Sequence, residues 1–100
     1  MVVEILYVPG CPNYPAALIR LRAVLKSEAI DAAIREIPIN DEATAQALLF
    51  PGSPTIRING LDAEPGNQQT FGVACRLYSG GAGLPSKQAL ERAITAAKRS

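Results

Sequence analysis

The residues of this sequence best suited to chemistry are its two cysteines, Cys11 and Cys75. A thiolate is both a nucleophile and a ligand for soft metals. The sequence contains no histidine, which excludes Cys–His and Ser–His–Asp catalysis and zinc held by imidazole. Two cysteines alone do not complete a zinc site, which usually takes about four nitrogen or sulfur ligands. The candidate chemistry therefore depends on the thiols, the carboxylates and the backbone amides, and we expect no resident metal and no cofactor.

Cys11 lies where a predicted strand, residues 2–8, meets a predicted helix, residues 16–26. Ligand sites tend to lie at such junctions in α/β sheets, and amides at a helix N-terminus stabilise a thiolate. The start of the helix leaves two alternatives. If Cys11 is the N-cap, the helix dipole acts on it directly, but Pro15 then removes a hydrogen bond to its carbonyl. If Tyr14 is the N-cap, Pro15 fits the first helical position and Cys11 lies outside the first turn.

The rest of the chain predicts three more strands and two more helices. The strands are residues 33–39, 55–58 and 70–78, and the helices are residues 43–49 and a helix from Pro85 or Ser86 to residue 97. Pro38 would remove a hydrogen-bond donor from its strand, so we place that strand at a sheet edge. Asn40 can cap the short helix, and Asn59-Gly60 is a turn signal. The order β-α-β-α-β-β-α predicts an α/β fold with a four-stranded mixed sheet and three helices.

Length and composition narrow the class of protein. The 100 residues are sufficient for one domain, residues 1–100, and 48% of them are hydrophobic, which excludes a disordered chain. Ten lysines and arginines are scattered among nine acidic residues, giving a net charge of +1, so we expect no nucleic-acid partner. No apolar run approaches the roughly 20 residues that span a bilayer, and no export signal is visible. We therefore expect a cytoplasmic protein without a membrane partner.

A second constellation, Ser53-Pro54-Thr55, opens the third predicted strand, where a proline is a natural place for a cis peptide bond. Together with the element order and the position of Cys11, it resembles the thioredoxin superfamily over nearly the whole chain. The stretches C-P-N, G-S-P-T-I-R-I-N-G and C-R-L-Y are similar to a group of short bacterial thioredoxin-like proteins. The resemblance implies a cis Ser53–Pro54 bond, with Pro54 facing Cys11. It also implies a substrate surface formed by Tyr14, Ser53, Pro54 and Thr55.

The sequence departs from the dithiol members of that family, because Tyr14 stands where the second cysteine of C-x-x-C would be. Tyr14 cannot resolve a mixed disulfide. We therefore expect thiol–disulfide exchange at Cys11. Either Cys11 acts alone, with an external thiol such as glutathione or with a protein partner, or Cys75 serves as a distant resolving thiol. A second hypothesis is a binding module that captures mercury or copper(I) through both thiols or docks a partner. A third is cleavage of carbon–mercury bonds by Cys11, Cys75 and Asp62.

Several of these residues also have a simpler, structural interpretation. Cys75 lies in apolar sequence, so a packed strand cysteine is the default, and Cys11 should be the more reactive thiol. Tyr14 is expected to pack over the start of the helix rather than to bind sulfur. Four charged residues are expected to be solvated, although the two arginines could form an anion-binding pair: Asp62, Glu64, Arg57 and Arg76.

Overall fold

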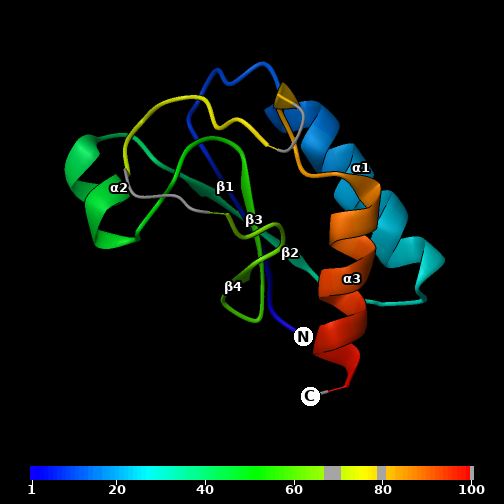
Figure 1. Ribbon diagram of the computed structural model, residues 1–100. Coiled ribbons are helices and arrows are strands. Elements are labelled where there is room, and N and C mark those ends of the chain that lie inside the picture. Colours follow the sequence, from blue (N-terminus) through cyan, green and yellow to red (C-terminus); the bar gives the residue numbers. More distant parts are fainter. Residues whose placement is uncertain (67–70, 79–80, 100) are drawn as a thin grey trace.

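The computed structural model describes residues 1–66, 71–78 and 81–99. Its elements, shown in Figure 1, are β1 (Val3–Tyr7), α1 (Tyr14–Ser27), β2 (Ile34–Pro38), α2 (Glu42–Ala47), β3 (Thr55–Ile58), β4 (Leu61–Asp62) and α3 (Lys87–Lys98). The predicted order of elements is confirmed. The fold is α/β, with a four-stranded mixed sheet and three helices in the described part of the chain.

The sheet has the strand order β2-β1-β3-β4. β1 and β2 are parallel and are joined by α1, whereas β3 is antiparallel to both of its neighbours, β1 and β4. β2 is therefore an edge strand, as Pro38 predicted, because its proline has no N–H to give to a second neighbour. This arrangement brings the carboxyl end of β1 next to the amino end of β3, so the loop after β1 lies beside the segment that precedes β3.

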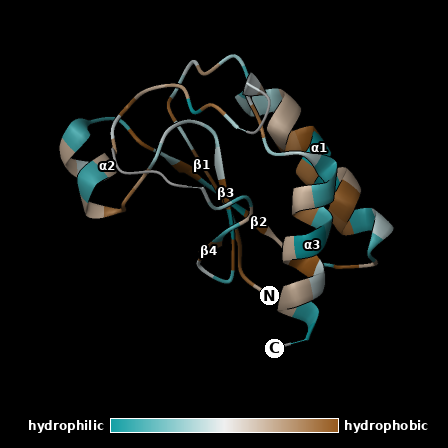
Figure 2. Cartoon of the chain, viewed as in Figure 1, coloured by the Kyte–Doolittle hydropathy of each residue, from teal (hydrophilic) through white to brown (hydrophobic). Residues whose placement is uncertain are grey.

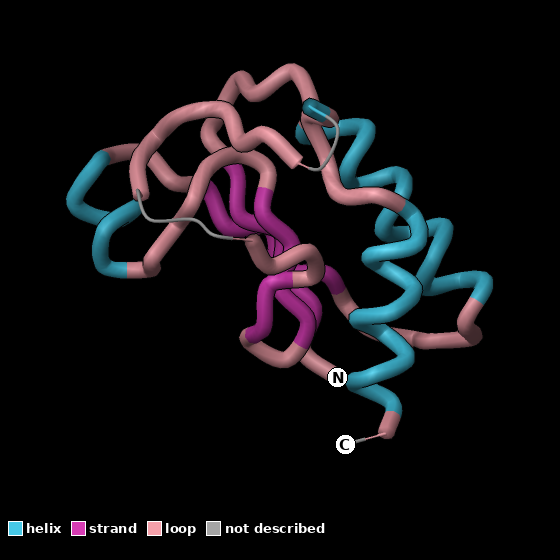
Figure 3. Tube along the Cα trace, in the orientation of Figure 1, coloured by secondary structure: helices cyan, strands magenta, loops and turns pink. Residues whose placement is uncertain are grey.

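Both faces of the sheet are covered, and the strands lie between α2 on one side and the α1–α3 pair on the other (Figure 3). In β1, Ile5 belongs to the core under α1 and α3, while Leu6 belongs to a second core under α2. Successive residues of a strand point to opposite faces, so β1 is apolar on both faces. Figure 2 shows brown, hydrophobic stretches within the strands, which lie between helices that mix hydrophobic and hydrophilic residues. No helix among the described residues has the length and apolarity needed to cross a membrane.

The returning strand predicted at residues 70–78 is wrong. The chain reverses immediately after β3, because Asn59 and Gly60 both adopt positive φ, 52° and 81°, and form a tight turn. β4 is therefore the short strand Leu61–Asp62, paired with the end of β3. Residues 71–78 form a loop with one isolated bridge to Ser53, and residue 70 lies outside the described residues.

The cap of α2 also differs from the prediction. Asp41, rather than Asn40, is the N-cap, and its carboxylate accepts a 2.7 Å hydrogen bond from the backbone N–H of Thr44. This hydrogen bond holds the pKa of the Asp41 carboxyl below its ordinary value. Both residue types are favoured at N-caps, so the sequence did not distinguish between them.

Gly52 is the glycine whose replacement should damage the fold. Its φ is +138°, and a Cβ there would lie 2.9 Å from the Cβ of Arg76, against backbone that cannot swing away. We expect Gly52→Ala to lower the free energy of unfolding by about 3 kcal/mol or more, measured by urea denaturation. Gly60→Ala is the matched control, since φ there is +81° but the space around it is open, and it should cost only about 1 kcal/mol. Equal losses would contradict the close approach of residue 76.

Candidate functional site

Cys11 lies in the loop between β1 and α1, where its side chain is partly buried and its thiol is free. Its N–H donates to the Val8 carbonyl at 3.0 Å, and its carbonyl accepts from Tyr14 at 3.3 Å. The N-cap of α1 is Asn13, so neither alternative for the helix start, Cys11 or Tyr14, is right. Pro15 still falls in the first turn, where its missing N–H has no helical partner to lose. Cys11 therefore lies outside that turn, and the expected direct action of the helix dipole on its thiol has no support in this geometry.

Tyr14 packs against a second aromatic ring. The rings of Tyr7 and Tyr14 are stacked, with centroids 3.9 Å apart and planes 12° from parallel. Tyr14 also lies against the core under α1 and α3. The packing role expected for this side chain is therefore confirmed, and the stack joins the end of β1 to the first residue of α1.

The Ser53–Pro54 peptide bond is cis, as predicted. Ser53, Pro54 and Thr55 are all buried, with Ser53 only 1% exposed. The Ser53 hydroxyl accepts from the N–H of Val8 at 2.9 Å, and the Thr55 hydroxyl donates to the Gly52 carbonyl at 2.7 Å. Val8 thus binds Ser53 through its N–H and Cys11 through its carbonyl, which connects the Cys11 loop directly to the segment before β3.

Cys75 is exposed and lies outside the named strands, so the expectation of a packed strand cysteine is wrong. Its backbone forms a parallel bridge with Ser53. The Ser53 N–H donates to the Ala74 carbonyl at 2.8 Å, and the Arg76 N–H donates to the Ser53 carbonyl at 3.0 Å. Cys75 also lines a pocket of about 460 Å³, together with residues that include Phe71 and Leu77. The structure therefore connects both cysteine-bearing segments to Ser53.

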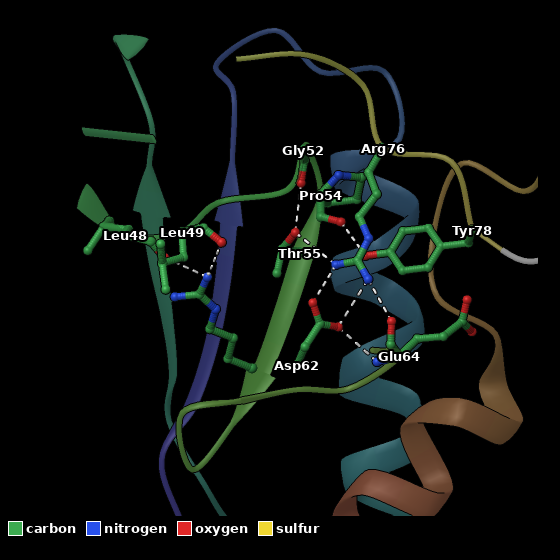
Figure 4. Close-up of polar contacts among 10 residues, drawn as sticks. Leu48, Leu49, Gly52, Pro54, Thr55, Asp62, Glu64, Arg76 and Tyr78 are labelled. Carbon is green, nitrogen blue, oxygen red and sulfur yellow. Dashed lines mark hydrogen bonds and ion pairs between the residues drawn. The ribbon is translucent and has the colours of Figure 1, made fainter. Parts of the chain in front are cut away.

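Arg76, expected to be solvated, is 2% exposed and is the centre of the polar network in Figure 4. Its two terminal nitrogens bind both carboxylate oxygens of Asp62, at 2.6 and 3.2 Å. The same nitrogens donate to the Thr55 hydroxyl at 3.1 Å and to the Glu64 carbonyl at 2.6 Å. Asp62 and Glu64, also expected to be solvated, are partly buried and engaged: the Asp62 side chain is 21% exposed and pairs with Arg76, and the Glu64 carboxylate accepts from the hydroxyl of Ser86. Sequence reasoning missed this network because the partners are 12 to 21 residues away from Arg76 along the chain.

Tyr78 completes the network. The guanidinium carbon of Arg76 lies 4.2 Å from the centre of the Tyr78 ring, a cation–π contact, and the Tyr78 hydroxyl donates to the Pro54 carbonyl. Burial raises the pKa of Tyr78 well above its ordinary value, and the positive charge of Arg76 offsets part of that rise. The phenol is therefore a neutral donor, and it attaches the end of residues 71–78 to the cis-proline segment.

Arg57 and Arg76 do not form the anion-binding pair that the sequence allowed. Arg57 donates to the carbonyls of Leu48 and Leu49, at the end of α2, while Arg76 is directed to Asp62 (Figure 4). The engagement of Asp62 also removes the acid that carbon–mercury cleavage would need. A pocket of about 690 Å³ lies between the β3–β4 hairpin and α3, but neither cysteine lines it.

Comparison with known proteins finds no matching protein family, no matching characterised protein and no matching solved structure. The function is therefore argued from the geometry of the site. That geometry consists of two free thiols on segments that are hydrogen-bonded to the buried Ser53–Pro54 segment, and a buried arginine beside one of them.

Asp62→Ala should destabilise the fold, because it leaves the buried guanidinium of Arg76 without its carboxylate. We expect the free energy of unfolding to fall by about 3 kcal/mol in urea denaturation. Asp31→Ala is the matched control, since Asp31 is exposed, and it should change stability by less than about 0.5 kcal/mol. A loss at Asp62 no greater than that at Asp31 would mean that the ion pair adds nothing to the fold.

Tyr78 should make the stability depend on pH in alkali. Because its pKa is raised above the ordinary 10.0, the folded protein keeps the phenol proton at pH values where the unfolded chain has lost it. The free energy of unfolding therefore falls as the pH rises above about 10. In urea denaturation between about pH 9 and pH 11, Tyr78→Phe should show a flatter decline than the unmodified protein. Parallel declines would contradict the burial of the phenol as the cause.

Proposed function

We propose that this protein is a thioredoxin-like domain that carries out thiol–disulfide exchange through Cys11. The sheet order, the helices on both faces and the cis Ser53–Pro54 bond agree with that resemblance. The observation that carries the proposal is the hydrogen-bonded connection between the Cys11 loop and Ser53 through Val8. It connects the loop that carries the free, partly buried Cys11 to the segment that opens β3, beside the carboxyl end of β1.

The exchange has two steps. The Cys11 thiolate attacks one sulfur of a disulfide, forms a mixed disulfide with it, and releases the other half as a thiolate that takes a proton from water. Tyr14 occupies the position of the second cysteine of C-x-x-C, but it is stacked on Tyr7 and has no sulfur, so it cannot release Cys11 from the mixed disulfide. An external thiol such as glutathione then attacks the mixed disulfide and regenerates the Cys11 thiolate. The two free thiols suit a reducing compartment such as the cytoplasm.

The burial of the cis-proline segment bears on the substrate. A partner chain that paired with the backbone of Ser53 would need its N–H and carbonyl, and residues 74 and 76 already occupy both. Ser53, Pro54 and Thr55 also expose almost no surface for contact. The site therefore favours small disulfides, such as those of glutathione, over an extended protein chain.

A second candidate function is the capture of mercury(II) or copper(I) between Cys11 and Cys75. The connection of both cysteine-bearing segments to Ser53 favours it, since two thiolates suffice for either ion. Capture predicts stoichiometric metal binding that either Cys→Ser change weakens, with no turnover of disulfides. Exchange predicts turnover that depends on Cys11.

The decisive measurement is turnover of a mixed disulfide of glutathione and a small thiol, with glutathione supplied and its oxidation coupled to glutathione reductase. We expect Cys11→Ser to reduce the rate to that of the uncatalysed exchange, because the attacking sulfur is lost. Cys75→Ser is the matched control and should keep most of the turnover, since excess glutathione can release Cys11. Turnover that survives Cys11→Ser would overturn the proposal.

A further inference from the structure

We infer that residues 71–78 act as a built-in strand that presents Cys75 as the resolving thiol for a mixed disulfide at Cys11. This inference rests on the proposed exchange at Cys11 and adds to it an internal second step. It also assigns a role to Arg76, as the residue that positions Cys75.

The segment is attached to the rest of the fold along its length. The Gly72 N–H donates to the Phe50 carbonyl at 3.1 Å, and the Val73 N–H donates to the Glu42 carboxylate at 3.2 Å. At the other end, the Tyr78 hydroxyl donates to the Pro54 carbonyl. Cys75 therefore lies on a segment that is held on both sides.

Cys75 itself lies between two hydrogen bonds to Ser53. Residue 74 accepts from the Ser53 N–H and residue 76 donates to its carbonyl, so Cys75 takes the place that one residue of an added parallel strand would take. Adjacent strands lie about 4.8 Å apart, which sets the spacing of Cys75 from Ser53. The backbone of Ser53 is thus already paired with the segment that carries Cys75.

Burial alternates over the last four residues of this segment, residues 75–78. Arg76 and Tyr78 are buried, whereas Cys75 and Leu77 are exposed, Leu77 by 71%. Successive side chains of an extended segment point to opposite sides, so the burial of Arg76 directs Cys75 outward. The pairing of Arg76 with Asp62 and with the Glu64 carbonyl therefore determines which side of the segment carries the thiol (Figure 4).

The loop that carries Cys11 is also connected to Ser53, through Val8. The Val8 N–H binds the Ser53 hydroxyl, and Val8 and Val73 both pack on the core formed by Leu6, Ile39, Ala45 and Phe50. The two segments that carry the cysteines therefore both form hydrogen bonds with Ser53, and both pack on the hydrophobic core under α2.

The chemistry balances without a further cofactor. A small disulfide is the oxidant: the Cys11 thiolate breaks its S–S bond, keeps one half as a mixed disulfide and releases the other half as a thiol. The Cys75 thiolate then attacks the Cys11 sulfur, forms the Cys11–Cys75 bond and releases the second half, which takes a proton from water. One disulfide is reduced to two thiols, and the protein dithiol is oxidised to one disulfide. External thiol later reduces that bond.

The test uses the fully reduced protein and glutathione disulfide, with no reduced glutathione, quenched by an alkylating reagent and analysed by intact mass and peptide mapping. We expect the product to lose two hydrogen atoms, to carry no glutathione and to contain a Cys11–Cys75 crosslink, at a rate independent of protein concentration. Cys75→Ser should instead accumulate glutathione on Cys11. A wild-type product that keeps glutathione on Cys11 with Cys75 alkylated, or that crosslinks between chains, would overturn the inference. It would leave exchange at Cys11 intact, because Cys11 would still have reacted.

Moving the thiol from residue 75 to residue 77 tests whether the position of the second thiol matters, or only its presence. In the double variant Cys75→Ser, Leu77→Cys, the sulfur content is unchanged and the new thiol is on the same exposed side, two residues from Ser53's partner. We expect the second thiol to release glutathione from Cys11 on the order of 10²-fold more slowly than in the wild type, since intramolecular attack depends on the alignment of the two sulfurs. Resolution at the wild-type rate would show that the pairing with Ser53 does not position the thiol. If neither variant nor wild type reacts at Cys11, the proposed function itself fails.

Discussion

A guanidinium that is almost completely removed from water imposes the strongest constraint on this structure. Arg76 has its side chain 1% exposed, and its charge is compensated by the Asp62 carboxylate, the Thr55 hydroxyl, the Glu64 carbonyl and the Tyr78 ring. These groups belong to β3, to β4 and the residues after it, and to residues 71–78 itself. Buried ion pairs add little net stability compared with apolar packing, but breaking one is costly. The main effect of the network is therefore to fix the relative positions of these three segments, and its contribution to the net stability of the fold is smaller.

That arrangement determines what Ser53 can do. Its hydroxyl is taken by Val8, and its N–H and carbonyl are taken by residues 74 and 76. Gly52 makes this possible, because any side chain there would collide with the backbone of Arg76. In a thioredoxin-like site the backbone beside the cis proline would receive a partner. Here residues 74 and 76 occupy that backbone, which is why the exchange we propose favours a small disulfide over an extended partner.

The sequence by itself determined the features that follow from local patterns. The apolar runs of the strands, the helical spacing of leucines and alanines, and the positive-φ turn at Asn59-Gly60 each depend on neighbouring residues, so the element order was predictable. The position of the fourth strand was not, because that strand is only the two residues Leu61–Asp62 directly after the turn. The packing of Tyr14 and the edge position of Pro38 belong to the same group, as does the cis bond before Pro54, through the family resemblance. The N-caps of α1 and α2 were missed by one or two residues because several adjacent residues suit a cap.

Only the tertiary structure decided the environment of the charged residues and of Cys75. An arginine near exposed residues is predicted to be solvated, because burying its charge without a partner costs more free energy than folding supplies. The partner, Asp62, lies 14 residues away and reaches Arg76 only because the tight turn after β3 places β4 beneath residues 71–78. The apolar sequence around Cys75 favoured a packed strand cysteine, but burying Arg76 and Tyr78 directs the alternate side chains, Cys75 and Leu77, to the surface.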